Sequence, residues 1–385
     1  MSSTFVILLL AVAVVALAVG YVAGLRAGRR QVPASPVFRP TPISVPPADG
    51  LPDASIEDVP AAPGQRPSPA DRPRSAGRAR KPEVATPASR AAVESGDRSK
   101  VLAAAQSWGY QLQNLDVKRA VASPFDILVV DYAKDGDDES ALKPAELARL
   151  KQRPDGGRRL MLAYFSIGEA ESYRSYWQKD WKRNRPEWLL GENPDWEENY
   201  AVCFWDPGWQ AILFGSPKAM LDKMMAQGFD GVYLDKCDVT EDLKAHEKAT
   251  ARTRPDLDGD MAALVRRLAD YARQRDPGFL VVMQNAESLL ERADVRAVLN
   301  ASAKEELLYG VDKPEKANSK DDVTWSRERL DLMRGEGKPV LLVEYLNDRE
   351  KIARAAEAAH QLGYLLYTSD RNRELDRLRY DMPEV

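Results

Sequence analysis

The chain has 385 residues, a formal net charge of −4, two histidines and two cysteines. So few histidines and cysteines argue against a zinc site built from several of them. A Ser-His-Asp triad would need one of the two histidines, but His360 lies at the end of a predicted surface helix and no nucleophile motif lies near His246. Residues 98–385 hold 44 basic and 51 acidic side chains, which argues against a nucleic-acid partner and leaves carboxylates, without metal or cofactor, to carry the chemistry.

The first 30 residues contain an uncharged apolar run, Phe5–Leu25, that is long enough to cross a bilayer as one helix. We predict a retained transmembrane anchor rather than a cleaved signal segment, because the run exceeds a signal core and no Lys or Arg precedes it. Arg26, Arg29 and Arg30 follow the run, and the positive-inside rule places such a flank in the cytoplasm.

Residues 31–97 are rich in Pro, Ala, Ser and Arg and hold 14 of the 26 prolines. Such a segment buries too little apolar surface to offset its ordering entropy, so we predict a disordered linker. A spacer of this kind suits an enzyme held away from an envelope surface. We therefore expect a membrane-anchored, extracytoplasmic domain, while the arginine flank leaves a cytoplasmic orientation open.

Residues 98–385 are predicted to form one α/β domain, a (β/α)₈ TIM-type barrel, because short apolar runs alternate with amphipathic helical stretches. The eight predicted strands cover residues 108–112, 126–131, 159–166, 231–235, 279–285, 305–309, 339–345 and 364–367. Ser216 indicates the start of one helix, which Gly228 ends, and Asp348 and Gly363 bound another.

Polar side chains lie within or at the ends of most of these strands, and the active site of such a barrel is found at the carboxyl ends. They are Asp131, Tyr164, Glu169, Asp235, Asn285, Glu287, Glu305 and Tyr345. Carboxylates aligned with tyrosines at so many strand ends indicate a sugar-binding cleft.

Five ordered motifs carry a resemblance to a known family: Trp108–Leu112, Ala163–Glu169, Phe204–Trp209, Gly228–Asp235 and Gln284–Glu287. Over about residues 105–370 the sequence resembles glycoside hydrolase family 114, which includes endo-α-1,4-polygalactosaminidases. The resemblance implies a TIM-type barrel and endo-cleavage of a partly de-acetylated galactosamine polymer, a cationic chain that would suit the acidic domain. It also implies that the carboxylates after strands four and five, Asp235 and Glu287, are the catalytic pair.

Glycoside hydrolysis needs one carboxyl group to protonate the leaving oxygen and a second to attack the anomeric carbon or activate water. We assign Asp235 as the nucleophile and Glu287 as the acid/base. A structural acid is the alternative for Asp235, and an acid at the start of a helix over Ser288–Leu299 is the alternative for Glu287. Glu305 is the best substitute catalyst, since a carboxylate inside an apolar strand is costly without a partner.

Further residues are expected to contact the sugar, because aromatic faces stack on sugars and polar groups bond their hydroxyls. The predicted substrate-binding residues are Asp131, Tyr164, Glu169, Trp205, Asp206, Tyr233, Asn285, Glu305 and Tyr345. A purely structural role is the alternative for Asp131, and helix capping is the alternative for Glu169. Cys203 and Cys237 flank the same mouth, and a disulfide between them is left open, since sequence does not give their separation.

Taken together, these features predict an anchored endo-glycosidase that acts on an amino-sugar polysaccharide. Two alternatives come from other classes of protein. One is a non-catalytic barrel that binds envelope polysaccharide, and the other is a cytoplasmic barrel with unrelated small-molecule chemistry, which would follow from an inverted anchor.

Overall fold

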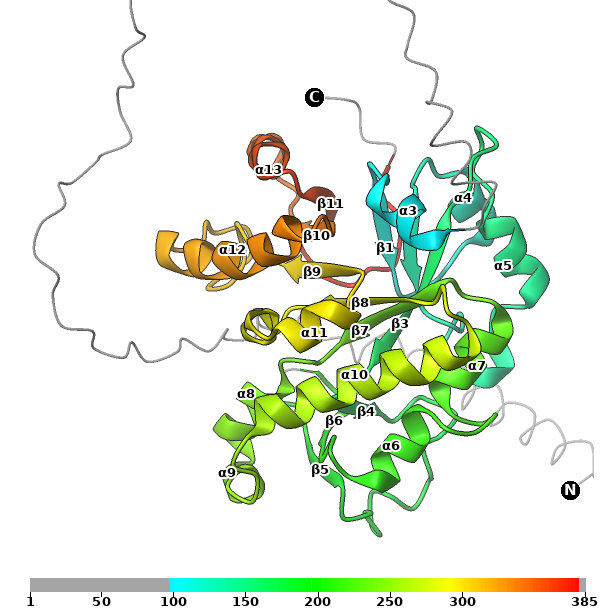
Figure 1. The fold of residues 1–385 in the computed structure, drawn as a ribbon, viewed down its shortest axis with the longest axis vertical. Coiled ribbons are helices and arrows are strands. Elements are labelled where there is room, and N and C mark those ends of the chain that lie inside the picture. The colour runs from blue at the N-terminus through cyan, green and yellow to red at the C-terminus, as the bar shows by residue number, and fades with distance from the viewer. Residues whose placement is uncertain (1–96, 195, 381–385) are drawn as a thin grey trace, which may run out of the picture.

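The structure is a computed structural model that describes residues 97–194 and 196–380. Eight parallel strands form one sheet in chain order, surrounded by helices (Figure 1). The strands are β1 (Trp108–Gln111), β2 (Ile127–Val130), β3 (Leu160–Ser166), β7 (Gly231–Asp235), β8 (Leu280–Gln284), β9 (Ala301–Glu305), β10 (Val340–Tyr345) and β11 (Leu365–Ser369). The predicted barrel of alternating strands and helices is confirmed.

Side chains of β1 bridge the two ends of this strand order, which are β1 and β11. The indole N–H of Trp108 lies 2.9 Å from the carbonyl oxygen of Leu365 and 3.2 Å from that of Leu342. The Trp108 ring stacks on Tyr110 and Tyr233, with ring centroids 5.9 and 6.1 Å apart. Aromatic rings therefore fill the barrel interior, which is a packed core rather than a pore.

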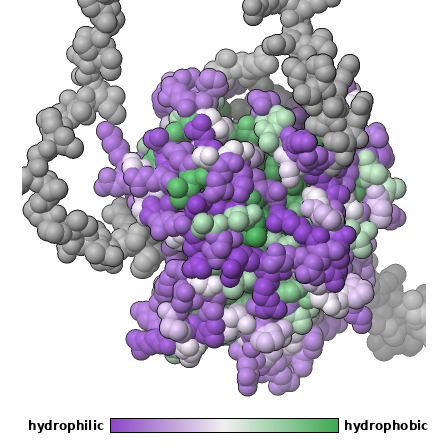
Figure 2. Space-filling view, in the orientation of Figure 1, coloured by the Kyte–Doolittle hydropathy of each residue, from purple (hydrophilic) through white to green (hydrophobic). Residues whose placement is uncertain are grey.

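The helices pack through apolar faces, as α10 illustrates: it buries Met261, Leu264, Val265 and Leu268, which recur at helical spacing. The helices are α3 (Arg98–Ala103), α4 (Val117–Ala122), α5 (Pro144–Leu150), α6 (Pro207–Leu213), α7 (Met220–Gln227), α8 (Val239–His246), α9 (Lys248–Ala251), α10 (Leu257–Arg275), α11 (Ala293–Val298), α12 (Lys320–Gly335) and α13 (Arg349–Leu362), with 3₁₀ turns η1 (Asp138–Ser140) and η2 (Glu287–Glu291). The outer face seen in Figure 2 is largely hydrophilic, with hydrophobic residues in small separate areas.

A long excursion after β3 forms a second, antiparallel sheet of β4 (Glu169–Glu171), β6 (Asn199–Val202) and β5 (Leu189–Glu192), which lies with α6 at the lower edge of Figure 1. Trp177, Trp181 and Trp188 form a chain of ring contacts 5.1–5.2 Å apart, which continues to Trp209. Trp196 does not join this chain and is 38% exposed. The tryptophans therefore stabilise the excursion.

Three local predictions differ from the structure. The sixth strand covers 301–305 rather than 305–309, because small side chains such as Ala301 and Ala303 make up its apolar face, whereas Leu307 is buried in the following loop. The helix predicted from Ser216 begins at Met220, and the helix predicted over 288–299 is divided at Arg292 into η2 and α11. The predicted C-caps hold, since Gly228 and Gly363 both end helices with positive φ.

The predicted anchor and linker, residues 1–30 and most of 31–97, lie outside the described residues, so both stay predictions. Within residues 97–194 and 196–380, the structure contains no helix with the length and apolarity needed to cross a membrane. Cys203 and Cys237 are both buried free thiols, so the disulfide that the sequence left open is not formed.

Candidate active site

Tight turns follow β7, β8 and β9 and set the direction of the side chains at the three strand ends. Lys236, Asn285, Ala286 and Glu306 all have left-handed backbones, with φ between 50° and 58°. Non-glycine residues seldom adopt this conformation, and such strained positions gather at functional sites. These turns leave the last residue of each strand, Asp235, Gln284 or Glu305, at the open end of the barrel.

Asp235 and Glu305 face each other across the Gln284 side chain. The Gln284 amide nitrogen, Nε2, lies 2.9 Å from Oδ1 of Asp235 and 2.9 Å from Oε2 of Glu305. Asn285 donates a longer hydrogen bond of 3.4 Å to the same Glu305 oxygen, and its own Oδ1 accepts from the Glu305 backbone N–H at 3.2 Å. Two carboxyl groups are thus fixed side by side.

Tyrosines hold the outer oxygens of both carboxyl groups. The Tyr164 hydroxyl donates to Oδ2 of Asp235 at 2.8 Å, and the Tyr345 hydroxyl donates to Oε1 of Glu305. The Tyr233 hydroxyl donates to Oε1 of Gln284, which fixes the orientation of that amide. Because Tyr233 is fully buried among the aromatic rings of the barrel, it supports the site from beneath rather than contacting a ligand.

The electrostatic environment of Glu305 favours its protonated form. Burial raises the pKa of Glu305 to about 7, and the nearby negative charge of Asp235 adds to this rise. A carboxyl group that keeps its proton near neutral pH beside a second, hydrogen-bonded carboxylate is the arrangement that acid/base catalysis uses.

Glu287 occupies a different place from the one predicted. Lys304 and Glu305 are consecutive in β9, so their side chains point to opposite faces of the strand. Glu287 contacts the outer of the two: its Oε1 lies 3.0 Å from Nζ of Lys304 and accepts from the Ser326 hydroxyl of α12 at 2.7 Å. Among the described residues no hydrogen bond joins Glu287 to Asp235 or Glu305.

The electrostatics of Glu287 also differ from those of an acid/base. Burial acts to raise its pKa, but the Lys304 ammonium and the Ser326 hydroxyl hold the pKa below its ordinary value. A general acid needs the opposite shift. The structure therefore offers Glu305, not Glu287, as the partner of Asp235, and Glu287 is a buried member of an ion pair.

Two residues predicted to contact the ligand, Asp131 and Glu169, instead form ion pairs between the barrel and the excursion. Oδ2 of Asp131 lies 2.8 Å from Nη1 of Arg174, and Nε of the same guanidinium lies 2.7 Å from Oε2 of Glu171. Glu169 lies 3.1 Å from Lys236 Nζ and accepts from Asn193 at 2.8 Å. Burial raises the pKa of both Asp131 and Glu169, and the neighbouring cations oppose that rise. Both carboxylates join the excursion to the barrel.

Trp205 and Asp206 lie in the excursion, directly before α6. Asp206 caps α6 by accepting from the Gly208 backbone N–H at 2.6 Å. The Trp205 ring is only half-buried, and the Arg254 guanidinium lies 5.4 Å from its centroid. Asp206 thus has a local structural role, and within the described chain no hydrogen bond or ion pair links it to Asp235 or Glu305.

The sequence of residues 88–381 matches the model of glycoside-hydrolase family GH114. The chain belongs to glycoside hydrolase family 114. It is 38% identical to an uncharacterised protein of Deinococcus radiodurans, over 74% of this chain and 86% of that protein. It is also 36% identical to an uncharacterised protein of Methanocaldococcus jannaschii, over 70% and 77% of the two chains. Membership of family 114 supports a glycoside hydrolase.

Two solved structures share the fold. The glycoside hydrolase domain of PelA from Pseudomonas aeruginosa has a TM-score of 0.53 and 19% identity, and the match covers 71% of this chain and 97% of that domain. Aspergillus fumigatus Ega3, solved in complex with galactosamine, has a TM-score of 0.51 and 17% identity, with 72% and 95% covered. At 19% and 17% identity, these two likenesses show the shared fold alone.

Sequence reasoning missed Gln284, Lys304 and Arg174 as members of the site and its support. Gln284 had a usable signal: it is a polar residue ending an apolar strand, on the same face as Leu280 and Val282. Lys304 and Arg174 had none, because their partners, Glu287 in η2 and Asp131 after β2, are distant in the sequence. Within the described part of this family 114 chain, no group of three or more His, Cys, Asp and Glu residues is arranged to hold a metal ion.

Proposed function

We propose that this protein is an endo-glycosidase that cleaves an α-1,4-linked galactosamine-type polysaccharide with Asp235 and Glu305 as its two carboxyl groups. The observation that carries the proposal is the shared Gln284 amide, which lies 2.9 Å from an oxygen of each. Those oxygens thus lie within about 6 Å of each other, nearer the roughly 5–5.5 Å of retaining enzymes than the roughly 6.5–9.5 Å of inverting ones.

In the proposed mechanism, Asp235 attacks the anomeric carbon while Glu305 transfers its proton to the leaving glycosidic oxygen. The glycosyl–Asp235 ester is then hydrolysed by water, whose proton returns to Glu305. Tyr164 and Gln284 hold Asp235 in the attacking orientation, and Tyr345 holds Glu305. Each step needs the two carboxyl groups in opposite protonation states, which the environment of Glu305 favours.

An amino-sugar polymer is the proposed substrate for two reasons. Residues 98–385 carry 51 acidic against 44 basic side chains, which favours a cationic ligand. The fold is also shared with Ega3, whose structure holds galactosamine. The predicted anchor and linker would hold the domain at the cell envelope, which we retain as part of the proposal.

Release of new reducing ends from partly de-acetylated α-1,4-galactosamine polymer tests this function. We expect turnover that produces oligomers of mixed length, as an endo-acting enzyme would, and none with fully N-acetylated polymer or with an α-1,4-glucan as control. A folded protein that binds the polymer without releasing reducing ends would favour the non-catalytic binding barrel instead.

The pH dependence of turnover follows from the environment of Glu305. Because its pKa is raised to about 7 and the acid must carry its proton, kcat/KM is expected to fall as pH rises through about 7. Initial rates from pH 5 to 9 measure this limb. Replacing Tyr345 with Phe removes a hydrogen bond that favours the ionised form of Glu305, so the limb should move to higher pH. A limb that the Tyr345→Phe change leaves in place would argue against Glu305 as the acid.

A further inference from the structure

A buried carboxyl group that the proposed mechanism does not use lies in the strand next to the acid Glu305. Glu344 belongs to β10 and is fully buried. Its Oε1 accepts the backbone N–H of Leu308 at 2.8 Å, and its Oε2 accepts that of Tyr309 at 3.2 Å. Both donors follow Glu305 closely in the chain, so Glu344 holds the turn into which the acid's strand continues.

The partners of Glu344 are backbone donors, and within the described residues no cation forms an ion pair with it. A buried carboxyl group without a cation is costly, and the two N–H groups offset part of that cost. Burial raises the pKa of Glu344 to about 8; the charge of Glu306 adds to the rise, and the two N–H donors and Lys304 oppose it. A protonated carboxyl group keeps acceptor capacity. The turn therefore retains an acceptor at the pH at which Glu305 carries its proton.

Glu344 and Tyr345 hold the end of β9 from opposite faces of β10, because consecutive residues of a strand point to opposite faces. On one face, the Tyr345 hydroxyl donates to Oε1 of Glu305. On the other face, Glu344 accepts from the turn that begins at Glu306. The two backbones are joined at the same level, since the Glu306 N–H donates to the carbonyl oxygen of Val343 at 2.9 Å. The position of the acid therefore depends on both faces of β10.

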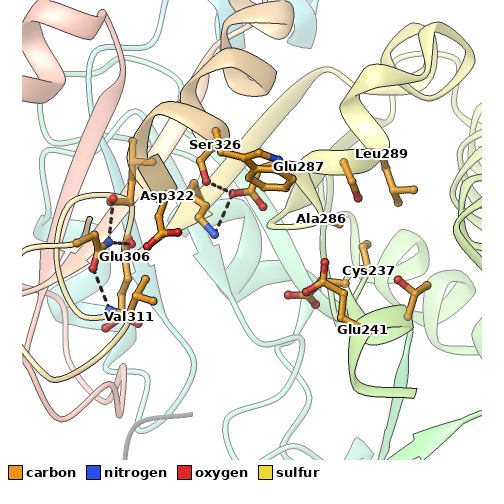
Figure 3. Close-up of a pocket in the computed structure, with 16 residues that line it drawn as sticks. Cys237, Glu241, Ala286, Glu287, Leu289, Glu306, Val311, Asp322 and Ser326 are labelled. Carbon is orange, nitrogen blue, oxygen red and sulfur yellow. Dashed lines mark hydrogen bonds and ion pairs between the residues drawn. The ribbon is translucent and has the colours of Figure 1, made fainter. Parts of the chain in front are cut away.

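The turn after β9 borders a cavity on another side. Glu306, Leu307 and Val311 line this cavity, which has a volume of about 130 Å³ and lies between the turn, η2 and α12 (Figure 3). Atoms that border a cavity have no packing partners on that side, so packing alone does not fix them. Polar contacts fix the turn instead. Besides Glu344, the Asn318 side chain donates to the carbonyl oxygens of Glu306 and Leu307 at 2.7 and 2.9 Å.

We propose that Glu344 is a positioning residue for the acid Glu305, acting through the turn that it holds by two backbone N–H groups. The inference rests on the proposed function. A general acid must lie within hydrogen-bond reach of the leaving oxygen, and a displacement of about 1 Å can lower the rate roughly a hundredfold. Glu344 serves the proton transfer by holding the end of β9 in register with Tyr345, and it does not itself transfer the proton.

Glu344→Gln tests this role, because glutamine keeps the shape but turns an N–H donor toward one of the two backbone N–H groups. We expect kcat/KM on the galactosamine polymer to fall roughly ten- to hundredfold. On an aryl glycoside of a galactosamine oligomer, whose phenol departs without a proton, kcat/KM should stay within about twofold. Hydrogen exchange at the amides of Leu308 and Tyr309 should become faster, since the turn opens more readily.

Asp230→Asn is the matched control, because Asp230 is also a fully buried acid that accepts a backbone N–H, that of Met161 at 3.0 Å. It precedes β7 at the opposite end of the barrel, so it should leave the ratio of the two kcat/KM values at the wild-type value. The role of Glu344 is overturned if Glu344→Gln lowers both values alike, if it lowers neither, or if Asp230→Asn changes the ratio in the same way.

If Glu344→Gln does not fold, Asn318→Ala decides the matter, since it releases the same turn from the side of α12 and should lower kcat/KM on the polymer alone. Wild-type rates separate this inference from the proposed function. A wild-type protein that turns over neither substrate overturns the hydrolase and this role of Glu344 with it. Wild-type turnover of both substrates, with no difference between them in the variants, overturns the role of Glu344 alone.

Discussion

Glu305→Gln is expected to lower kcat on the galactosamine polymer by about a thousandfold with little change in KM. Loss of a general acid costs roughly 10²- to 10⁴-fold, and glutamine keeps the shape and the hydrogen bonds to Gln284 and Tyr345 within reach. The loss should shrink for an aryl glycoside with an acidic phenol as leaving group, because that oxygen departs without a proton. Steady-state rates on both substrates measure the difference.

Asp235→Asn should lower turnover of both substrates alike, since a nucleophile is needed whatever the leaving group. Glu287→Gln is the informative comparison. It removes the buried charge partner of the partly buried Lys304, so it should lower the free energy of unfolding by roughly 3 kcal/mol while the folded protein keeps turnover within about tenfold. If Glu287→Gln instead abolished turnover at unchanged stability, and Glu305→Gln did not, the acid/base would be Glu287.

The fold could be predicted from the sequence because most of the strands are short apolar runs that end at, or directly before, a polar residue. Parallel strands buried on both faces have nearly continuous hydrophobic sequences, as Ile127–Val130 and Leu280–Gln284 do. The sixth strand was displaced by four residues for the same reason: its small residues Ala301–Ala303 give a weak hydrophobic signal, and Leu307–Tyr309 beyond it give a strong one.

The sequence predicts which site residues lie together only for residues within strands, where side chains alternate between the two faces. Asp235 and Glu305 end neighbouring parts of one parallel sheet, so their convergence follows from β7, β8 and β9 being adjacent. Glu287 lies past the end of β8, after two left-handed residues, Asn285 and Ala286. Beyond such a turn, the alternation of strand faces no longer fixes the direction in which a side chain points. The ion pair between Glu287 and Lys304 therefore depends on packing against α12.

The motif that ends in Asp235 contains a second acid with a different role. Asp230 precedes β7 at the opposite, N-terminal end of the barrel and is fully buried. Its Oδ1 lies 2.8 Å from Arg158, 2.9 Å from Lys151 and 3.2 Å from Arg98. Residues at this end of a TIM barrel serve stability rather than catalysis, and five residues of strand separate Asp230 from Asp235 by about 16 Å.

Asp230→Asn is therefore expected to lower the free energy of unfolding by about 3–4 kcal/mol while turnover of the folded protein stays within about twofold. The cost arises because three cations lose their shared carboxylate and the Met161 backbone N–H loses a charged acceptor. Denaturant titration measures the loss, and Asp276→Asn is the control. Asp276 is partly exposed and, in the described part of the chain, forms an ion pair with Arg98, so its removal should cost under about 1 kcal/mol. Loss of turnover at unchanged stability would contradict this expectation, because it would give Asp230 a role at the catalytic, C-terminal end of the barrel.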